Sequence, residues 1–295
     1  MRKYYTRACN FHYGKAANKL IQSKKAFSLN GRKDIAFNTI EIFTRKKNKI
    51  TSRLIHIRDI YKLNKNIKKI VKNDLKKIIL KRKNFLKNVN FSKPSIMGIL
   101  NLTPDSFCDG GKFNKKNKSI KHLSFMIKSG AEIIDVGGES TRPGSKTVPN
   151  KIEWKRVEHV IKNFKKINKK TCLSIDTRKS DIMLKSIKFG VDLINDVSGF
   201  SFDQSSLYKL KKYKIPKVLH HMKGTPNTMQ KNPKYKNVLL DIYDFFEKNI
   251  DKIHNKKLVI DPGIGFGKNL KHNLTLISKI SLFHSLGFPI LVGTS

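Results

Sequence analysis

Short apolar runs rich in β-branched residues recur along the chain from residue 95 onward. Seven such runs are found, at 95–101, 131–138, 171–177, 191–199, 217–222, 257–263 and 289–295. The segments between them begin with polar residues and carry apolar positions at helical spacing, over 117–129, 152–168, 179–189, 203–213, 236–254 and 270–286. Strands that alternate with helices predict a parallel sheet covered by helices. The runs are nearly continuous, as is typical of strands buried on both faces.

The polar ends of these predicted strands indicate which parallel architecture the chain adopts. An open doubly wound sheet concentrates its site at one switch point, whereas a barrel collects residues from nearly all strand ends. Here every predicted strand contributes, through Asn101, Asp135, Glu139, Asp176, Asn195, Asp196, His220, His221, Asp261, Thr294 and Ser295. We therefore predict an α/β fold, a (β/α)8 TIM-type barrel over 93–295, with only seven βα strands present because the chain is truncated after the seventh.

Residues 1–92 show a different pattern and hold no chemical motif. Apolar positions nearly alternate over 35–43, which predicts a strand. Apolar residues at helical spacing over 60–87 predict a basic helix. Such a helix could lie on a membrane surface, bind a partner or pack against the neighbouring domain, and we favour packing. We place a domain boundary at 92/93 and treat 1–92 as a basic N-terminal extension of unknown role.

Composition adds a strong positive charge, with 63 Lys and Arg against 21 Asp and Glu and a net charge of +42. Such a charge can indicate a polyanionic partner. Lys, Asn and Ile are abundant together, as compositional drift across a proteome also produces, so we expect no nucleic-acid partner. No apolar run reaches the roughly 18 residues of a membrane span, and no apolar region follows the basic N-terminus. Three scattered cysteines suit a reducing compartment, so we expect a cytoplasmic protein.

Two glycine-containing loops after the first two predicted strands carry the candidate chemistry. The first reads NLTPDSF over 101–107 with DGG close behind at 109–111, and the second reads GGESTRPG over 137–144. Their hydroxyls, amide, carboxylates and arginine could together bind an anionic, aromatic substrate. Pro104 or Pro143 alone would be explained equally well by turn formation. The ordered set of polar residues at strand ends is what favours a substrate site.

The chain resembles the dihydropteroate synthase family in six motifs that follow one another in order. They are NLTPDSF…DGG, IIDVGGESTRPGS, LSIDT, INDVSG, HHMKGTPNTMQ and IDPGIGFGKN, and they span about 94–295. The resemblance implies a (β/α)8 barrel that joins 6-hydroxymethyl-7,8-dihydropterin pyrophosphate to p-aminobenzoate, giving 7,8-dihydropteroate and pyrophosphate for folate biosynthesis. It also implies Mg²⁺ as the cofactor and a homodimer as a possible assembly.

The resemblance assigns a role to each matching residue. The pterin site would consist of Asp176, Asn195, Met222, Asp261 and Phe266. Burying the polar edge of a pterin is costly unless each group is paired, and carboxylates and amides can pair it. The p-aminobenzoate site would consist of Phe107, Thr141, Arg142 and Pro143. Asn101 would bind the metal beside the pyrophosphate. The resemblance gives Asn101, Asp105 and Arg142 as the catalytic residues.

Several alternatives stay open. In the family the seventh strand continues into a Ser-Arg-Lys motif, of which this chain keeps the Ser as Ser295, and an eighth strand supplies Arg-x-His. We therefore expect a fragment of a longer product, a barrel completed by a second chain, or an inactive relative. The segment 35–43 is a less favoured source of the missing strand. A pterin-dependent methyltransferase would have no use for the loop 140–143. A non-enzymatic basic binding protein would bind DNA or RNA with a strong dependence on salt and would not respond to pterins.

Two further motifs are discounted as sites. His220 and His221 could form a metal pair, but adjacent strand residues point to opposite faces, so we expect packed or hydrogen-bonded histidines. The glycines over 263–267 lack the GxGxxG spacing of a dinucleotide loop. Lys268 matches a family lysine to which we assign no role.

Overall fold

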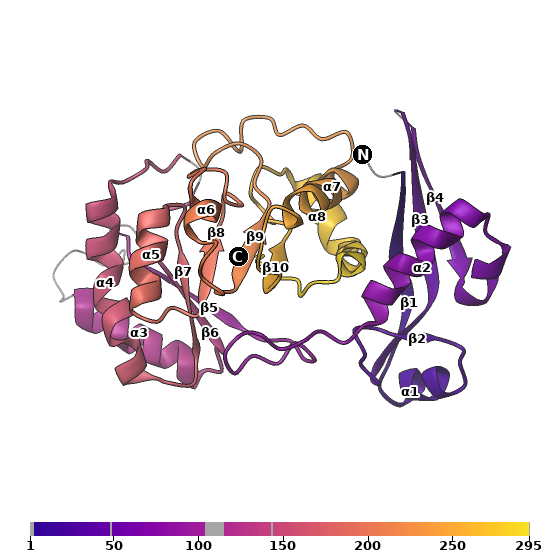
Figure 1. Cartoon of the computed structure of the whole chain (residues 1–295), viewed down its shortest axis with the longest axis horizontal. Helices are drawn as coiled ribbons and strands as arrows, with labels where there is room; N and C mark the ends of the chain where they lie inside the picture. Colours follow the sequence, from indigo (N-terminus) through magenta and orange to yellow (C-terminus); the bar gives the residue numbers. More distant parts are fainter. Residues whose placement is uncertain (1–2, 48, 104–114, 143, 295) are drawn as a thin grey trace. The chain divides into compact units, whose positions relative to one another are not determined.

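The computed structural model describes residues 3–47, 49–103, 115–142 and 144–294, and the chain forms two compact units (Figure 1). Unit 1 comprises Met1–Lys83, Tyr235–Lys248 and Leu270–Ile290, and unit 2 comprises Asn84–Lys234, Asn249–Asn269 and Leu291–Ser295. The N-terminal segment therefore shares a unit with stretches from the C-terminal part of the chain. None of the described helices combines the length and hydropathy required to cross a membrane.

Unit 2 is built on a six-stranded parallel sheet with the order β10-β9-β8-β7-β6-β5. Its strands are β5 Met97–Asn101, β6 Ile133–Gly137, β7 Cys172–Asp176, β8 Leu193–Asp196, β9 Lys217–His220 and β10 Leu258–Asp261. Neighbours in space are neighbours in sequence, which is the order of a (β/α) barrel and not that of a doubly wound sheet. Six predicted strands are thereby confirmed.

The seventh predicted strand, 289–295, is not formed as a ladder in the part of the chain that the structure describes. Leu291 donates its backbone N–H to the Ile260 oxygen of β10 at 2.9 Å. This bond places the segment beside β10, where a further strand of a barrel would pair. One hydrogen bond does not make a strand, so the strand predicted over 289–295 is not formed in the described residues.

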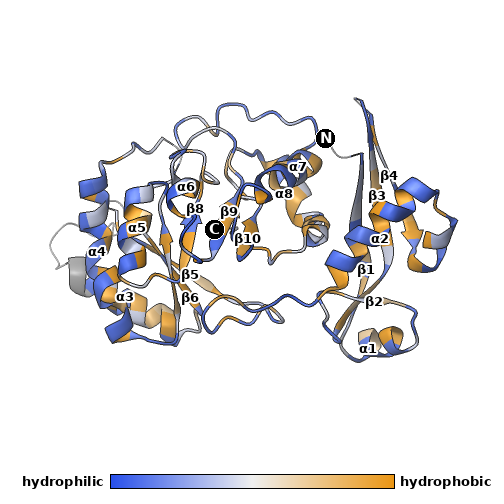
Figure 2. Cartoon of the chain, viewed as in Figure 1, coloured by the Kyte–Doolittle hydropathy of each residue, from blue (hydrophilic) through white to orange (hydrophobic). Residues whose placement is uncertain are grey.

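Helices connect the strands of unit 2 as the pattern predicted. They are α3 Lys115–Lys128, α4 Asn150–Ile167, α5 Ser180–Lys188 and α6 Ser206–Lys209. Helix α3 contacts β5 and β6, and α4 contacts β6. Figure 2 shows both hydrophobic and hydrophilic stretches on these helices. The helix predicted over 203–213 is shorter than expected, and its start moves to Ser206 because Asp203 accepts hydrogen bonds from the backbone of Ser180 and Ser205 and holds a turn there.

The inner face of the sheet changes from apolar to polar along each strand. One buried cluster at the amino ends comprises Ile133, Cys172, Leu193, Val218 and Val259, with Leu86 and Val89 packed onto it. Side chains two positions apart on a strand share a face. The same face therefore continues into Asp135, Ser174, Asn195, His220 and Asp261. Alternation thus places an apolar floor beneath a row of polar groups.

Unit 1 contains an antiparallel sheet in which β3 pairs with three other strands. Its elements are β1 Tyr4–Tyr13, α1 Gly14–Gln22, β2 Phe27–Ser28, β3 Ile35–Lys46, β4 Lys49–His56, η1 Ile57–Lys62, α2 Lys65–Ile79, α7 Val238–Ile250, α8 Leu270–Ser278 and η3 Ile280–Leu286. The strand predicted over 35–43 is confirmed as β3. Because β3 pairs within this sheet, it does not supply a strand to the parallel sheet of unit 2.

The predicted helix 60–87 is α2 with a short helical turn before it. Its apolar stripe packs into the core of its own unit, unit 1, where α2 contacts β1 and also η3, a segment that we expected in the neighbouring domain. The predicted C-terminal end was wrong, since α2 ends at Ile79. The buried Arg82 side chain donates to the Lys77, Leu80 and His284 carbonyl oxygens at 2.6, 3.0 and 3.0 Å. It thereby satisfies carbonyls that a helix end leaves unpaired.

We expect His284→Asn to reduce the sensitivity of the chain to acid. Burial, with a smaller effect of the Arg82 charge, lowers the pKa of His284 to about 4. The folded chain then binds fewer protons than the unfolded chain between pH 4 and the ordinary value of about 6.5, so the free energy of unfolding falls as the pH falls through this window. Removing the histidine should recover up to about 3 kcal/mol at the acid end. Urea unfolding at several pH values measures this, and parallel curves for wild type and variant would contradict it.

Candidate active site

Three predicted site residues and one glycine lie side by side at the carboxyl ends of β5 to β8. The parallel register pairs Asn101 with Gly137, Gly137 with Asp176 and Asp176 with Asn195. A Cβ atom on Gly137 would lie 3.2 Å from Asn101 Oδ1 and 3.4 Å from Asp176 Oδ2. The glycine therefore leaves the space into which its two neighbours extend. The sequence predicted these residues at one edge, and the structure brings them together.

Asp135, two residues before Gly137 on the same face of β6, orients the side-chain amide of Asn195. The Nδ2 group of Asn195 donates to Asp135 Oδ2 at 2.7 Å, and both side chains are buried. The amide oxygen is thereby left as the free acceptor. Among the described residues, no donor reaches Asn195 Oδ1 or Asp176 Oδ1. Buried polar atoms without partners are costly, so this row is suited to a ligand that presents several N–H donors.

The carboxyl groups of this row are electrostatically coupled. Burial, and then the charges of Asp135 and Asp196, raise the pKa of Asp176 well above its ordinary value. Burial also raises the pKa of Asp135. Two neighbouring buried carboxyls resist simultaneous ionisation. Hydrogen bonds from a ligand would favour the ionised form of Asp176, so ligand binding and proton release should be linked.

A second group of predicted residues gathers at the ends of β9 and β10. Asp261 pairs with His220 in the register, and its Oδ2 lies 3.9 Å from His220 Nε2. The His220 ring donates from Nδ1 to the Val197 oxygen at 2.8 Å and meets the Phe266 ring edge-on at 4.7 Å. Burial lowers the pKa of His220, so the ring is neutral. His220 is therefore hydrogen-bonded and packed, as predicted, and it supports the ring of Phe266.

Lys268 holds the loop that carries Phe266. Its buried ammonium donates to the oxygens of Phe266 and His221 at 2.9 and 3.2 Å and contacts His221 Nδ1 at 3.0 Å. Burial lowers the pKa of Lys268 to about 7. These contacts give the lysine, to which the sequence assigned no role, the task of fixing the turn after β10.

Three of the four predicted p-aminobenzoate residues, Thr141, Arg142 and Pro143, belong to the segment between β6 and α4, hereafter the β6–α4 loop (138–149). Thr141 is half-buried and Arg142 is exposed. Ser145 closes the tip of the loop, because its hydroxyl donates to the Ser140 oxygen at 2.6 Å and its backbone N–H donates to the Arg142 oxygen at 3.1 Å. The tip thus presents Thr141 and Arg142 from a compact turn.

A buried set of charged side chains under this loop was missed by the sequence analysis. It comprises Glu139, Glu153, Thr177, Arg178 and Lys179, hereafter the Glu139 cluster. Only Glu139 stood out in the sequence, as a polar residue at a strand end. Its partners lie about 40 residues away in the chain, and no local spacing could have shown that they meet.

The remaining predicted residues are less well placed. Asp105, Phe107 and Pro143 lie outside the described residues. Met222 is half-buried two residues beyond β9. The described residues contain no group of three or more histidines, cysteines or carboxylates that could hold a metal. Mg²⁺ often binds through one or two protein oxygens together with substrate phosphates, and the exposed amide oxygen of Asn101 is compatible with that mode.

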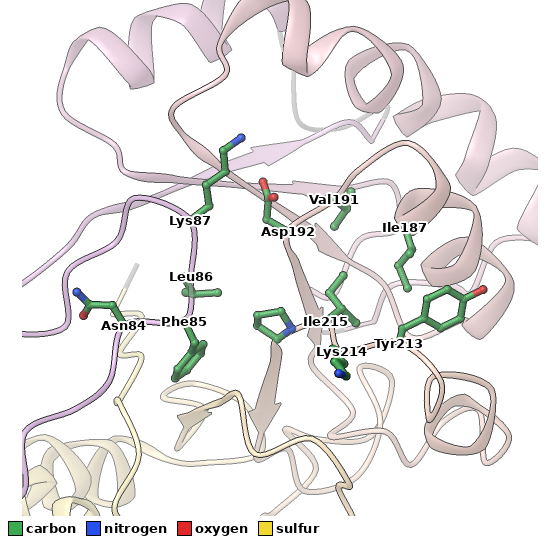
Figure 3. A pocket seen from close by; sticks show the side chains of 11 residues that line it. Asn84, Phe85, Leu86, Lys87, Ile187, Val191, Asp192, Tyr213, Lys214 and Ile215 are labelled. Carbon is green, nitrogen blue, oxygen red and sulfur yellow. The ribbon is translucent and has the colours of Figure 1, made fainter.

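A cavity of about 610 Å³ lies elsewhere in unit 2 (Figure 3). Its walls come from the segment before β5 and from the connections leading into β8 and β9, through Asn84, Phe85, Leu86, Lys87, Ile187, Val191, Asp192, Tyr213, Lys214, Ile215 and Pro216. Asp192 and Pro216 directly precede β8 and β9, so the cavity is at the amino ends of these strands. It contains no predicted site residue, and barrel enzymes carry their sites at the opposite end.

Comparisons with known proteins find similar sequences and structures over the part of the chain that forms the parallel sheet. A family described as pterin binding enzyme matches residues 97–295. The dihydropteroate synthase of Escherichia coli K12 is 41% identical over 213 residues, which cover 70% of this chain and 75% of that protein. The solved dihydropteroate synthase of Yersinia pestis is 40% identical with a TM-score of 0.66, covering 70% of this chain and 76% of that one. That of Xanthomonas albilineans is 33% identical with a TM-score of 0.66, covering 72% and 79%.

Proposed function

Because the chain belongs to the dihydropteroate synthase family, we propose that it condenses 6-hydroxymethyl-7,8-dihydropterin pyrophosphate with p-aminobenzoate. The products are 7,8-dihydropteroate and pyrophosphate, and the reaction serves folate biosynthesis. Solved Xanthomonas albilineans relatives carry 4-aminobenzoic acid in one case and 7,8-dihydropteroate in another. The observation that carries the proposal is the row of unpartnered buried acceptors on Asp176 and Asn195.

The pterin ring matches this row in chemistry and shape. Its pyrimidine edge presents N–H and amino donors, and Asp176 and Asn195 offer acceptor oxygens at the same level of the sheet. Asp261 adds a carboxylate whose Oδ1 is already engaged by the Gly263 N–H at 2.7 Å, which leaves Oδ2 for a ligand. Phe266 supplies an aromatic face that His220 supports. Together these residues would orient the ring and keep each buried polar group paired.

The reaction then requires little acid–base help from the protein. The amine nitrogen of p-aminobenzoate forms a bond to the methylene carbon of the pterin, the C–O bond to pyrophosphate breaks, and the amine loses a proton. Arg142, exposed at the tip of the β6–α4 loop, would pair with the carboxylate of p-aminobenzoate. Thr141 beside it would contact the ring. Positioning the two substrates is then the main contribution of these residues.

We further propose that Asn101 holds Mg²⁺ through its amide oxygen. Its side chain extends over Gly137 towards Asp176, next to the pterin row. When bound there, the cation would neutralise charge on the departing pyrophosphate. Asp105 remains a proposal for binding the metal or ordering the first loop, and Phe107 for packing against p-aminobenzoate. A homodimer and a cytoplasmic location also stay predictions.

Pyrophosphate release by the purified 295-residue chain tests the proposed function. With the pterin pyrophosphate and Mg²⁺ present, we expect release that depends on added p-aminobenzoate and stops when EDTA removes the cation. A folded chain that releases no pyrophosphate under these conditions would contradict the proposal. Release that is unaffected by EDTA would contradict the role of Mg²⁺ alone.

A further inference from the structure

The side chain of Glu139, at the start of the β6–α4 loop, binds the backbone near the end of the same loop. The Glu139 carboxylate, 5% exposed, accepts from the backbone N–H of Val148 at 2.9 Å. Lys179 donates to the Val148 oxygen at 2.6 Å and to Glu139 Oε2 at 2.7 Å. The peptide of Val148 is therefore held on both sides, and the segment between Glu139 and Val148 is closed into a ring that carries Thr141 and Arg142.

The ring is fastened to the rest of unit 2 by further buried charges. Arg178 donates from Nε to Glu139 Oε1 at 3.1 Å and makes a second contact to the same oxygen through Nη2. Glu153 of α4 accepts from both Lys179 and Thr177. The charges balance, with two carboxylates facing two cations. Although burial opposes ionisation, the hydrogen bonds from Lys179 and Arg178 hold the pKa of Glu139 below its ordinary value.

The carboxyl end of β7 contributes both to the pterin row and to the anchor of the β6–α4 loop. Thr177, Arg178 and Lys179 directly follow Asp176, the last residue of β7. Asp176 offers its oxygen to the pterin row, and the next three residues anchor the β6–α4 loop. The loop is therefore located relative to the pterin row by a short stretch of buried chain.

We propose that Glu139 is a positioning residue for p-aminobenzoate: with Arg178 and Lys179 it fixes the tip of the β6–α4 loop over the pterin row without touching either substrate. This inference rests on the proposed function. The contacts of Glu139, Arg178 and Lys179 with the loop, hereafter the clamp, fix Thr141 and Arg142. Asp176 and Asn195 are fixed by the strand register. Loss of the clamp should therefore weaken binding of the amine substrate and leave the pterin affinity nearly unchanged.

Glu139→Gln tests this inference, because it keeps the shape of the side chain and an acceptor for Val148 but removes the charge that faces Arg178 and Lys179. We expect the KM for p-aminobenzoate to rise about tenfold or more, with the pterin Kd within about twofold of wild type. Glu158→Gln is the matched control, since Glu158 forms an exposed pair with Lys162 on α4. It should change neither quantity. Equal losses for the two substrates, or an unchanged KM, would overturn the proposal.

A second variant covers the case in which the buried, unpaired cations prevent folding. Glu139→Gln with Lys179→Met removes one carboxylate and one cation from the cluster, so Glu153 and Arg178 remain and the buried charges stay balanced in number. This double variant should fold, and it should still show the raised KM for p-aminobenzoate. A wild-type KM in a folded double variant would show that the clamp does not position the loop.

Hydrogen exchange separates failure of this inference from failure of the proposed function. The amides of 144–148 should exchange faster in Glu139→Gln than in wild type, while those of β7 should not. This comparison needs no turnover. If wild type makes no dihydropteroate but the exchange difference is seen, the proposed function fails and the clamp stands. If wild type is active and no exchange difference is seen, the clamp fails and the function stands.

Discussion

Asp176→Ala should fold as wild type does and lose most of its affinity for the pterin substrate. The substitution removes an acceptor oxygen that has no donor among the described residues, so no existing hydrogen bond to that atom is lost. In the complex, ring donors of the ligand would be buried without a partner, at about 1–3 kcal/mol for each. The pterin Kd should rise by about one to two orders of magnitude. Calorimetric titration with the pterin measures it.

The pH dependence of the wild-type affinity gives an independent signature of the same carboxylate. The pKa of Asp176 is raised by burial and by its acidic neighbours, whereas a ligand with N–H donors requires the ionised form. Binding therefore releases a proton, and affinity should rise with pH until the raised pKa is passed. Asp176→Ala should lose this dependence.

Asp192→Ala is the matched control, because Asp192 lies at the other end of the sheet, before β8, where its carboxylate accepts from the Leu173 N–H at 3.0 Å. It should lower stability slightly and leave pterin binding unchanged. Equal loss of pterin affinity in both variants would remove Asp176 from the site and attribute the effect to the fold.

The parallel sheet was predictable from local pattern because each strand is an apolar run that ends in a polar residue. The six runs from 95–101 to 257–263 became β5 to β10 in sequence order. The C-terminal end of α2 was not predictable, because the residue that ends it, Arg82, also binds the oxygen of His284, about 200 residues away. Whether a helix continues through such a point depends on tertiary contacts, and the sequence pattern carries no information about them.

The candidate site, like the fold, was predictable from the sequence only in part. Asp176, Asn195 and Asn101 were identified because their motifs are contiguous in sequence and their strands are parallel, so their ends must meet. The two-residue period of a strand predicts that Asp135 lies on the same face as Gly137. The orientation of the Asn195 amide could be seen only from its hydrogen bond to Asp135 in the structure. The Glu139 cluster joins two loops whose sequences give no sign of mutual contact. Position on a strand was thus predictable, and pairing between loops was not.

Arg142→Ala should raise the KM for p-aminobenzoate strongly and leave folding intact. Arg142 is exposed, and its hydrogen bonds come from its backbone: its N–H donates to Ser140 Oγ at 3.4 Å, and its oxygen accepts from the Ser145 N–H at 3.1 Å. Alanine keeps both. A hydrogen bond to a charged group contributes about 1.5–3 kcal/mol, so the KM should rise by about 10- to 100-fold. Initial rates at saturating pterin pyrophosphate measure it.

The comparison with two further variants decides whether a general positive charge or the guanidinium itself is needed. Lys146→Ala removes an exposed cation from the same loop and should have little effect on the KM. Arg142→Lys keeps the charge but loses the planar pair of donors that matches a carboxylate, so it should recover only part of the loss. If Lys146→Ala were as harmful as Arg142→Ala, the loop would act through its overall charge. If Arg142→Ala weakened pterin binding equally, the arginine would serve the structure of the loop and not the amine substrate.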